Sequence, residues 1–422
     1  MQFQKHLSHR ALWAATFAFA ANFSVWTLYA VLGVEIRSDL DLSATEFGLL
    51  LAAPMFTGAI IRWPVGIYVE RANGKRFFVW QMVLTLPALL ILPSVKTYFD
   101  FLLVGLWLGV SGVSFTIGIR YISDWFESKF LGTVMGVFGS GNAGAAVTLL
   151  LVPLLMDYIS WRWVGYVYAV GFFLVIVFFA FIAPAPLPYM QEKAREVEAI
   201  NPYLDIRIWR FSLYYYFVFG SFLALILWLP QYYMSAYELS FIQAMNLTLL
   251  FTFVSSTVRA LGGYYADKYG ARTVNWSVFW VCLVCLFFLS YPPTTMTIHG
   301  IRGEVNLYLE INVWVFTSLI LVIGIAQGFG RASVYKIIHN YYPNHMGQAG
   351  GFVSFIGALG GCSLPVLFGL ADDLVGVHSA CFMLLYGLLA GCMIIMFYAN
   401  KADEYQQRLK QAIEHNFLEI DD

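Results

Sequence analysis

Two arginines, Arg62 and Arg259, lie inside long apolar segments of the sequence, and no aspartate or glutamate falls in the interior of any such segment. A guanidinium group stays charged in proteins and offers a planar fork of N–H donors, which matches a planar or bidentate oxyanion. A charge at the centre of a bilayer costs about 2.5–3.5 kcal/mol on insertion scales. The pair therefore predicts a site for a small anion.

The two arginines begin the same short pattern. Each is followed by a glycine after four residues, an acid after eight and a base after nine. This repeat predicts two similar halves with a solute site between them near the membrane midplane. The glycines would let helix backbones approach closely, and the acid–base loops would latch the cytoplasmic ends. In a purely structural alternative, the arginines form ion pairs within the membrane or extend to its surface. The pattern residues are Gly66, Glu70 and Arg71 in the first half, and Gly263, Asp267 and Lys268 in the second.

The overall composition is that of a membrane protein. Of the 422 residues, 60% are apolar and 12% are charged, whereas ordinary soluble domains have roughly 45–50% and about 25%. This excludes a soluble enzyme and a disordered chain. The net charge of −1 gives no basic surface for nucleic acid. The five cysteines all lie in apolar segments, so we expect no metal site, redox pair or cofactor.

Apolar segments long enough to cross a bilayer recur along the whole chain. Because a backbone in hydrocarbon must satisfy its own hydrogen bonds, we expect helices. The fold class is therefore an all-α membrane protein, with an N-terminal six-helix bundle (1–184), a cytoplasmic linker (185–208) and a C-terminal six-helix bundle with a short tail (209–422). The twelve expected spans are 11–34, 46–69, 77–94, 98–122, 130–156, 162–184, 209–235, 241–266, 274–292, 311–338, 346–371 and 377–400.

Lysine and arginine counts orient the chain in the membrane. Of the 24 such residues, two lie inside spans and four (Arg37, Lys96, Arg162 and Arg302) lie on one side, which leaves eighteen on the side of both termini. Arg331, in the tenth span, is counted among the eighteen. We therefore expect a multi-pass protein of the cytoplasmic membrane with both termini and the linker in the cytoplasm.

The fifth and eleventh spans are rich in glycine. Glycine is costly inside a helix, but in a membrane small residues let helices pack closely, so packing alone is one explanation. Asn142 favours a second one. It is a lone amide within a run of glycines, where a small ligand could approach both backbone and side-chain donors.

At these residues the sequence resembles the nitrate/nitrite porter family of the major facilitator superfamily. Residues 121–126 followed by 136–144 are similar to the first signature of that family, and 356–361 to the second. Arg62 and Arg259 match its pair of substrate arginines. The resemblance covers the whole chain and implies that the arginines and the signature asparagine hold nitrate between aromatic rings. The implied site residues are Arg62, Arg259 and Asn142, with Tyr215 and Phe219, then Trp26 and Phe115 as weaker candidates, and Gly139 and Gly357 from the two signatures.

An anion that enters a cell against an inside-negative potential climbs about 2.3 kcal/mol per charge per 100 mV, so uptake needs coupling to another solute. Exchange of nitrate for internal nitrite needs no titrating group, and the lack of midplane carboxylates favours it. Residues 228–233, however, resemble the proton-symport branch of the family. On that basis we expect symport of nitrate, and of nitrite, with protons in nitrate assimilation. Candidate proton carriers are Glu35, Asp124 and His339.

Two other functions are compatible with parts of the sequence. A facilitator for another small anion or an organic acid would also use paired arginines, although glycine-lined, aromatic spans favour a small ligand. A membrane enzyme or sensor is the other class. An enzyme would need a nucleophile, an acid–base pair or a metal cluster in the cavity, and the sequence offers none at a shared depth. We therefore expect a monomeric transporter whose partners are a small anion, lipid and protons, and not an enzyme.

Overall fold

The computed structural model describes residues 2–69, 72–123, 125–126, 130–185, 201, 204–301, 303–343 and 345–418. Within these ranges, twelve helical segments are long and apolar enough to cross a membrane. The predicted number of spans is confirmed. The first span continues to Leu40, beyond the expected limit of 34. Most of the predicted linker, 185–208, falls outside the described residues.

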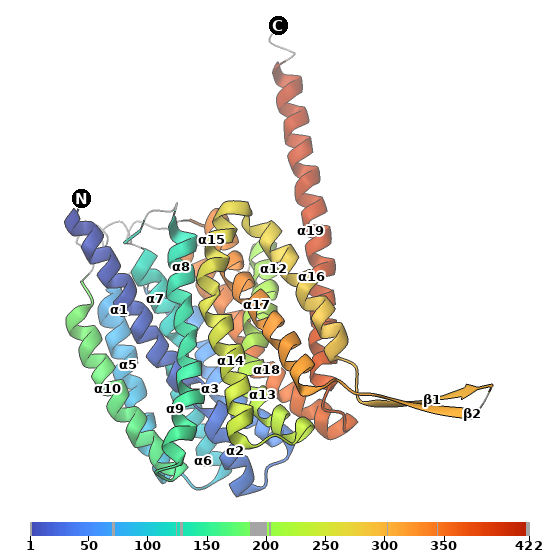
Figure 1. The fold of residues 1–422 in the computed structure, drawn as a ribbon. Coiled ribbons are helices and arrows are strands. Elements are labelled where there is room, and N and C mark those ends of the chain that lie inside the picture. The colour runs from blue at the N-terminus through green and yellow to red at the C-terminus, as the bar shows by residue number, and fades with distance from the viewer. Residues whose placement is uncertain are drawn as a thin grey trace.

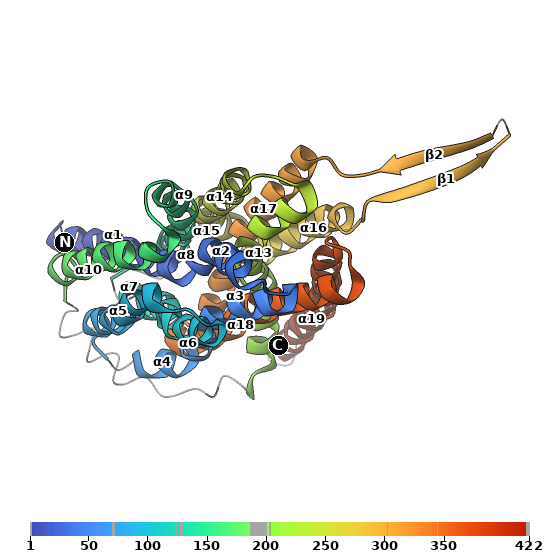
Figure 2. The same cartoon turned by 90° about the horizontal axis from the view of Figure 1, so that it is seen from below.

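Helices α1 to α10 precede residue 185 and helices α12 to α19 follow residue 204, and we call them the first and the second half (Figures 1 and 2). The first half holds α1 (Gln2–Trp26), α2 (Tyr29–Leu40), α3 (Ala44–Ile60), α4 (Arg62–Val69), α5 (Gly74–Ile91), α6 (Tyr98–Leu108), α7 (Ser114–Ser123), α8 (Leu131–Gly139), α9 (Gly144–Met156) and α10 (Val164–Ile182). The second holds α12 (Ile206–Tyr215), α13 (Ser221–Tyr237), α14 (Phe241–Thr257), α15 (Arg259–Tyr269), α16 (Ala271–Leu289), α17 (Val313–Tyr341), α18 (Met346–Val375) and α19 (Ala380–Leu418).

Several spans are interrupted halfway across the bundle. Short 3₁₀ segments separate α6 from α7 (η2, Gly109–Val113) and α8 from α9 (η4, Ser140–Ala143), and a π-helical turn separates α12 from α13 (η7, Tyr216–Gly220). Single-residue breaks separate α3 from α4 and α14 from α15. Irregular backbone at membrane depth is tolerated where it is buried in protein or lines a cavity. These breaks therefore mark the level at which a site can be built.

The two halves meet along α3 with α18 and along α8 with α15, pairs that lie side by side in Figure 2. The helix α1 begins and α19 ends at the same end of the bundle (Figure 1). We call this the terminal end, and the other the opposite end. The placement of both termini on one side is as expected from twelve spans.

The same turn joins the first two spans of each half. In the first half Asp41 adopts a left-handed conformation (φ 49°), and Ser43 then caps α3 with a capping box to Glu46. In the second half Glu238 (φ 53°) precedes Ser240, which caps α14 through the same type of box. Because a capping box satisfies otherwise unpaired N–H groups, both helices start at defined residues. The repeat predicted from the arginines thus extends to these turns.

A β-hairpin departs from the all-α expectation. Strands β1 (Thr294–Gly300) and β2 (Gly303–Leu309) pair antiparallel between α16 and α17 and extend sideways from the bundle (Figures 1 and 2). Its register places Met296 opposite Leu307, and Thr297 opposite Asn306 on the other face. This alternation of apolar and polar residues is the period of a strand. The sequence interpretation treated the segment only as a loop between spans.

Candidate anion site between the two halves

Both predicted arginines are completely buried at the breaks described above. Arg62 is the first residue of α4 and Arg259 the first of α15, and their exposed fractions are 0% and 1%. Both side chains are enclosed within the bundle, which favours the site interpretation over the structural alternative of extended side chains. Among the described residues, no ion pair joins either guanidinium to a carboxylate. Two uncompensated positive charges therefore lie inside the bundle.

The hydrogen bonds of Arg62 lie within its own half. Its Nε and Nη2 atoms donate to the carbonyl oxygen of Gly112 in η2, at 3.0 and 2.7 Å. The guanidinium carbon lies 4.7 Å from the ring centroid of Trp26 and 5.3 Å from that of Phe219, distances typical of cation–π contact. The third nitrogen, Nη1, has no hydrogen-bond partner. Arg62 thus keeps one buried donor for a ligand.

Arg259 is held by the other half. Its Nη1 donates to the amide oxygen of Asn142 at 3.1 Å, once that amide is oriented so that its oxygen faces the donors around it. A second contact, to the carbonyl oxygen of Gly139, is long at 3.5 Å. The guanidinium carbon lies 5.0 Å from the ring of Phe115, and Nε has no partner. Arg259 therefore also retains a buried donor.

Aromatic rings connect the two arginines. Phe115 is within cation–π distance of Arg259 and also of Arg62, whose guanidinium carbon is 5.8 Å from the ring. Phe219 is nearly parallel to Phe115 (18°), with centroids 6.4 Å apart, and stacks on Tyr215 at 5.0 Å. The hydroxyl of Tyr215 is buried without a partner. The structure thus brings all four implied aromatic residues, including Trp26, to the arginines.

The three consecutive tyrosines 214–216 show how selective this arrangement is. Tyr215 faces the site, whereas Tyr214 packs against Phe279 and the hydroxyl of Tyr216 bonds to Ser363. The aromatic composition could not choose among them, and the family resemblance selected Tyr215. The additional ring of Tyr335 in α17 was not predicted. It lies edge-on to both Tyr215 (5.0 Å) and Phe115 (5.4 Å).

Two predicted glycines leave the space that the site residues occupy. A Cβ atom at Gly139 would lie 2.3 Å from the guanidinium carbon of Arg259, and one at Gly357 would lie 2.3 Å from the ring of Tyr215. Neither distance is possible for real atoms. Gly139 and Gly357 are therefore required for Arg259 and Tyr215 to sit where they do, in addition to any role in helix packing.

A third buried arginine was missed by the sequence interpretation. Arg331 in α17 is 0% exposed and was wrongly counted among the residues on the terminal side. Its Nη1 donates to the same Asn142 oxygen at 2.8 Å, and its Nη2 donates to the backbone and side-chain oxygens of Ser255 at 2.6 and 2.7 Å. Its guanidinium carbon lies 3.6 Å from the ring centroid of Phe222. Its position inside the predicted tenth span was the available signal.

Three of the predicted latch residues, Gly66, Gly263 and Asp267, lie at the contact between the halves near the terminal end. A Cβ atom at Gly66 would lie 2.7 Å from the carbonyl oxygen of Gly347, and one at Gly263 would lie 2.5 Å from that of Gly132, so the halves touch backbone to backbone. Asp267 accepts hydrogen bonds from the backbone N–H (3.2 Å) and hydroxyl (3.1 Å) of Thr133 at the start of α8. These contacts of Gly66, Gly263 and Asp267 cross the interface between the halves.

The base that pairs with Asp267 is Lys336 of α17, at 2.8 Å. Lys268, the base of the predicted latch in this half, lies over the ring of Tyr269. Lys268 and Asp267 are neighbours in a helix and point in different directions, whereas α17 runs beside α15. Glu70 and Arg71, the acid and base of the first copy, lie outside the described residues.

The opposite end is also closed by glycines. A Cβ atom at Gly48 would lie 2.5 Å from the carbonyl oxygen of Pro365, and one at Gly369 would lie 2.3 Å from that of Ala44. The carboxylate of Asp373 accepts a hydrogen bond from the backbone N–H of Thr45 at 2.8 Å. Both ends of the interface are therefore closed over the arginines, which is an occluded arrangement.

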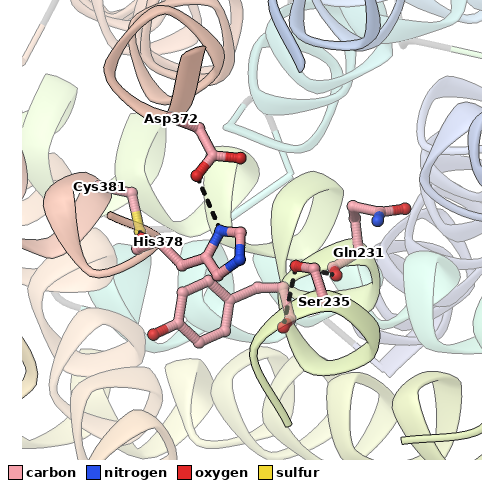
Figure 3. A network of polar contacts seen from close by, with 6 residues as sticks. Gln231, Ser235, Asp372, His378 and Cys381 are labelled. Carbon is pink, nitrogen blue, oxygen red and sulfur yellow. Dashed lines mark hydrogen bonds and ion pairs between the residues drawn. The ribbon is translucent and has the colours of Figure 1, made fainter. Parts of the chain in front are cut away.

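A titratable pair lies beside this opposite closure. Nδ1 of His378, in the turn between α18 and α19, donates to the carboxylate of Asp372 at 2.7 Å (Figure 3). This hydrogen bond raises the pKa of His378, against smaller opposing effects of burial and of Arg37. Of the predicted proton carriers, His339 is buried in α17 and Glu35 lies in α2, while Asp124 is outside the described residues.

Fold and site together define a membrane transporter of the Major Facilitator Superfamily, and residues 12–365 match the profile of that family. The chain belongs to this superfamily and, within it, to the nitrate/nitrite porters, as the sequence resemblance implied. It is 34% identical to the "Probable nitrate/nitrite antiporter NarK1" of Thermus thermophilus, over 90% of this chain and 89% of that protein. It is 26% identical to the "Nitrite extrusion protein" of Bacillus subtilis strain 168, over 98% of both chains.

Solved structures agree on the fold. The human organic anion transporter MFSD10 superposes with a TM-score of 0.70, at 13% identity, over 92% of this chain and 99% of that one. A bacterial homologue of the lysosomal transporter Spinster, described as inward-facing and occupied, superposes with a TM-score of 0.67 at 16% identity, over 92% and 96%. At these identities the likeness concerns the architecture alone.

Proposed function

We propose that this protein carries nitrate, and nitrite, across the cytoplasmic membrane by alternating access between its two halves. The observation that supports this most directly is the pair of buried, unpaired donors, Arg62 Nη1 and Arg259 Nε. They come from opposite halves and flank one aromatic ring, Phe115. A small planar anion accepts hydrogen bonds in its plane and stacks on rings through its faces, so it suits this arrangement.

The same geometry would also explain why the halves close around an anion. Like charges that approach in a low-dielectric interior repel each other strongly. An anion between Arg62 and Arg259 removes much of this repulsion and so stabilises the occluded state relative to the open states. A ligand shifts a conformational equilibrium only through such differential binding.

This charge distribution favours exchange as the coupling mode. An empty carrier would have to close over its cations without an anion before it could return, whereas an exchanger closes only when loaded. Exchange of nitrate for nitrite is electroneutral and needs no titrating group. The name of the Thermus relative, a nitrate/nitrite antiporter, agrees with this proposal.

Proton symport, the mode preferred from residues 228–233, is the second candidate. The observation that favours it is the pair of His378 and Asp372, which lies beside the contact of Asp373 with Thr45 at the opposite closure. A proton there could influence when that end opens. We also propose that the terminal end faces the cytoplasm and that the protein acts as a monomer.

Uptake of labelled nitrate into proteoliposomes tests these proposals. Vesicles preloaded with nitrite are compared with empty vesicles under an imposed inward proton gradient. Uptake that depends on internal nitrite supports exchange, and uptake driven by the gradient into empty vesicles supports symport. Absence of nitrate and nitrite transport under both conditions, in protein that is folded and reconstituted, would refute the substrate assignment.

A further inference from the structure

Arg331 brings a third permanent positive charge to the anion site. Its Nη1 and the Nη1 of Arg259 both bond to the Asn142 oxygen, so these two nitrogens lie within about 6 Å of each other, where like charges in a protein interior still repel appreciably. The side chain of Arg331 is completely buried, so solvent does not screen its charge.

The groups that hold Arg331 are all neutral. They are the oxygens of Ser255 at 2.6 and 2.7 Å, the carbonyl oxygen of Gln327 at 3.2 Å, the amide oxygen of Asn142 and the ring of Phe222. These contacts satisfy the N–H donors and offset the cost of burial, but they leave the net charge in place. Among the described residues, no carboxylate forms an ion pair with Arg331. The positive charge is therefore available to a nearby anion.

Arg331 also determines which group of the Asn142 amide, the oxygen or the NH2, can contact an anion. The amide oxygen can only accept hydrogen bonds, and its NH2 group can only donate them. An anion accepts, so it is repelled by the oxygen and attracted by the NH2 group. Because both arginines donate to the amide oxygen, the oxygen stays directed toward the two guanidinium groups and cannot turn toward the ligand.

We propose that Arg331 is a third cation of the anion site and the positioning residue that fixes Asn142 and Arg259 relative to each other. The proposal rests on the proposed function of the site as a nitrate or nitrite site. Because Asn142 belongs to the first half and both arginines to the second, this shared oxygen is also a polar contact between the halves at the depth of the ligand. Affinity and closure are thereby linked through one side chain.

The test is nitrate and nitrite binding to the purified protein, measured by calorimetry in Arg331→Gln and Arg331→Lys. Glutamine removes the charge, and we expect roughly 10- to 100-fold weaker binding, since a unit charge within about 8 Å acts through an effective dielectric constant near 20. Lysine keeps the charge but cannot span Ser255 and Asn142 together, so its loss should be smaller. Arg162→Gln is the matched control, because it removes an arginine that pairs with Asp39 at the surface.

Binding by Arg331→Gln within about twofold of the unchanged protein, or equal losses in both variants, would overturn the charge role. A double-mutant cycle with Asn142→Ala tests the positioning role, and additive losses would overturn it. If Arg331→Gln does not fold, the positioning role is tested by the same double-mutant cycle with Arg331→Lys in place of Arg331→Gln. A protein that binds neither anion before any substitution refutes the proposed function instead, so the two failures are distinguishable.

Discussion

The backbone contacts at the two ends of the interface predict that single methyl groups will bias the protein toward opposite conformations. In Gly48→Ala, the new Cβ would lie 2.5 Å from the carbonyl oxygen of Pro365, which is most of an ångström inside ordinary contact. In Gly66→Ala, it would lie 2.7 Å from that of Gly347. Both neighbours are backbone atoms and cannot rotate away, so the helices must separate.

The magnitude follows from the cost of overpacking. Extra methyl groups in well-packed interiors cost about 1–3 kcal/mol, which corresponds to a roughly 5- to 150-fold shift of a two-state equilibrium. Gly48→Ala penalises closure of the opposite end, and Gly66→Ala penalises closure of the terminal end. Gly171→Ala is the matched control, since a Cβ there meets no atom within 4 Å.

Labelling of an introduced cysteine measures the shift. Thr116 is buried at the terminal half of the interface, where its hydroxyl bonds to that of Ser354 at 3.2 Å. In a background without the native cysteines, a cysteine at position 116 should react faster with a maleimide in Gly66→Ala and more slowly in Gly48→Ala. Changes in the same direction in both variants, or changes no larger than in Gly171→Ala, would refute the reasoning.

Three further predictions concern charge. Arg62→Lys or Arg259→Lys should nearly abolish nitrate binding in calorimetry, because a point charge replaces a planar fork; near-normal affinity in either would discredit the site. Asn142→Asp should weaken nitrate binding by more than about 100-fold without loss of thermal stability, because its carboxylate would take the place of the anion between two guanidinium groups; retained affinity would contradict this. The raised pKa of His378 means that its bond to Asp372 stabilises the fold below about pH 6.5 and that this contribution is lost as the pH rises through the higher folded-state pKa. As the pH rises through that range, the melting temperature of the His378→Gln variant should therefore fall less than that of the unchanged protein. Identical pH profiles of the two proteins would argue against a stabilising His378–Asp372 bond.

The spans and the paired arginines were predictable because they depend on properties that a sequence carries directly. Hydropathy sets the length of a membrane helix, and a charge inside such a segment is conspicuous. The repeat was also visible in the turns, since Asp41-Leu42-Ser43 and Glu238-Leu239-Ser240 share one pattern, although the interpretation did not use it.

Other features could not be predicted with the same ease. Arg331 was assigned by a count of positive residues per side, a rule that ignores depth within a span. The breaks in the helices depend on which neighbouring groups satisfy the freed backbone atoms, as Arg62 does for Gly112, and that is tertiary information. Tyr215 was selected over its two neighbours only by the family resemblance, because the face that each tyrosine presents depends on how the end of α12 packs.

The partners of the two arginines bear on how the chain can be made. Arg62 finds its carbonyl partner, Gly112, within the first half, so two of its nitrogens can be hydrogen-bonded before the second half exists. Arg259 finds Asn142 and Gly139 only in the first half. In synthesis from the N-terminus these acceptors are made before Arg259, and a second half produced alone would lack them.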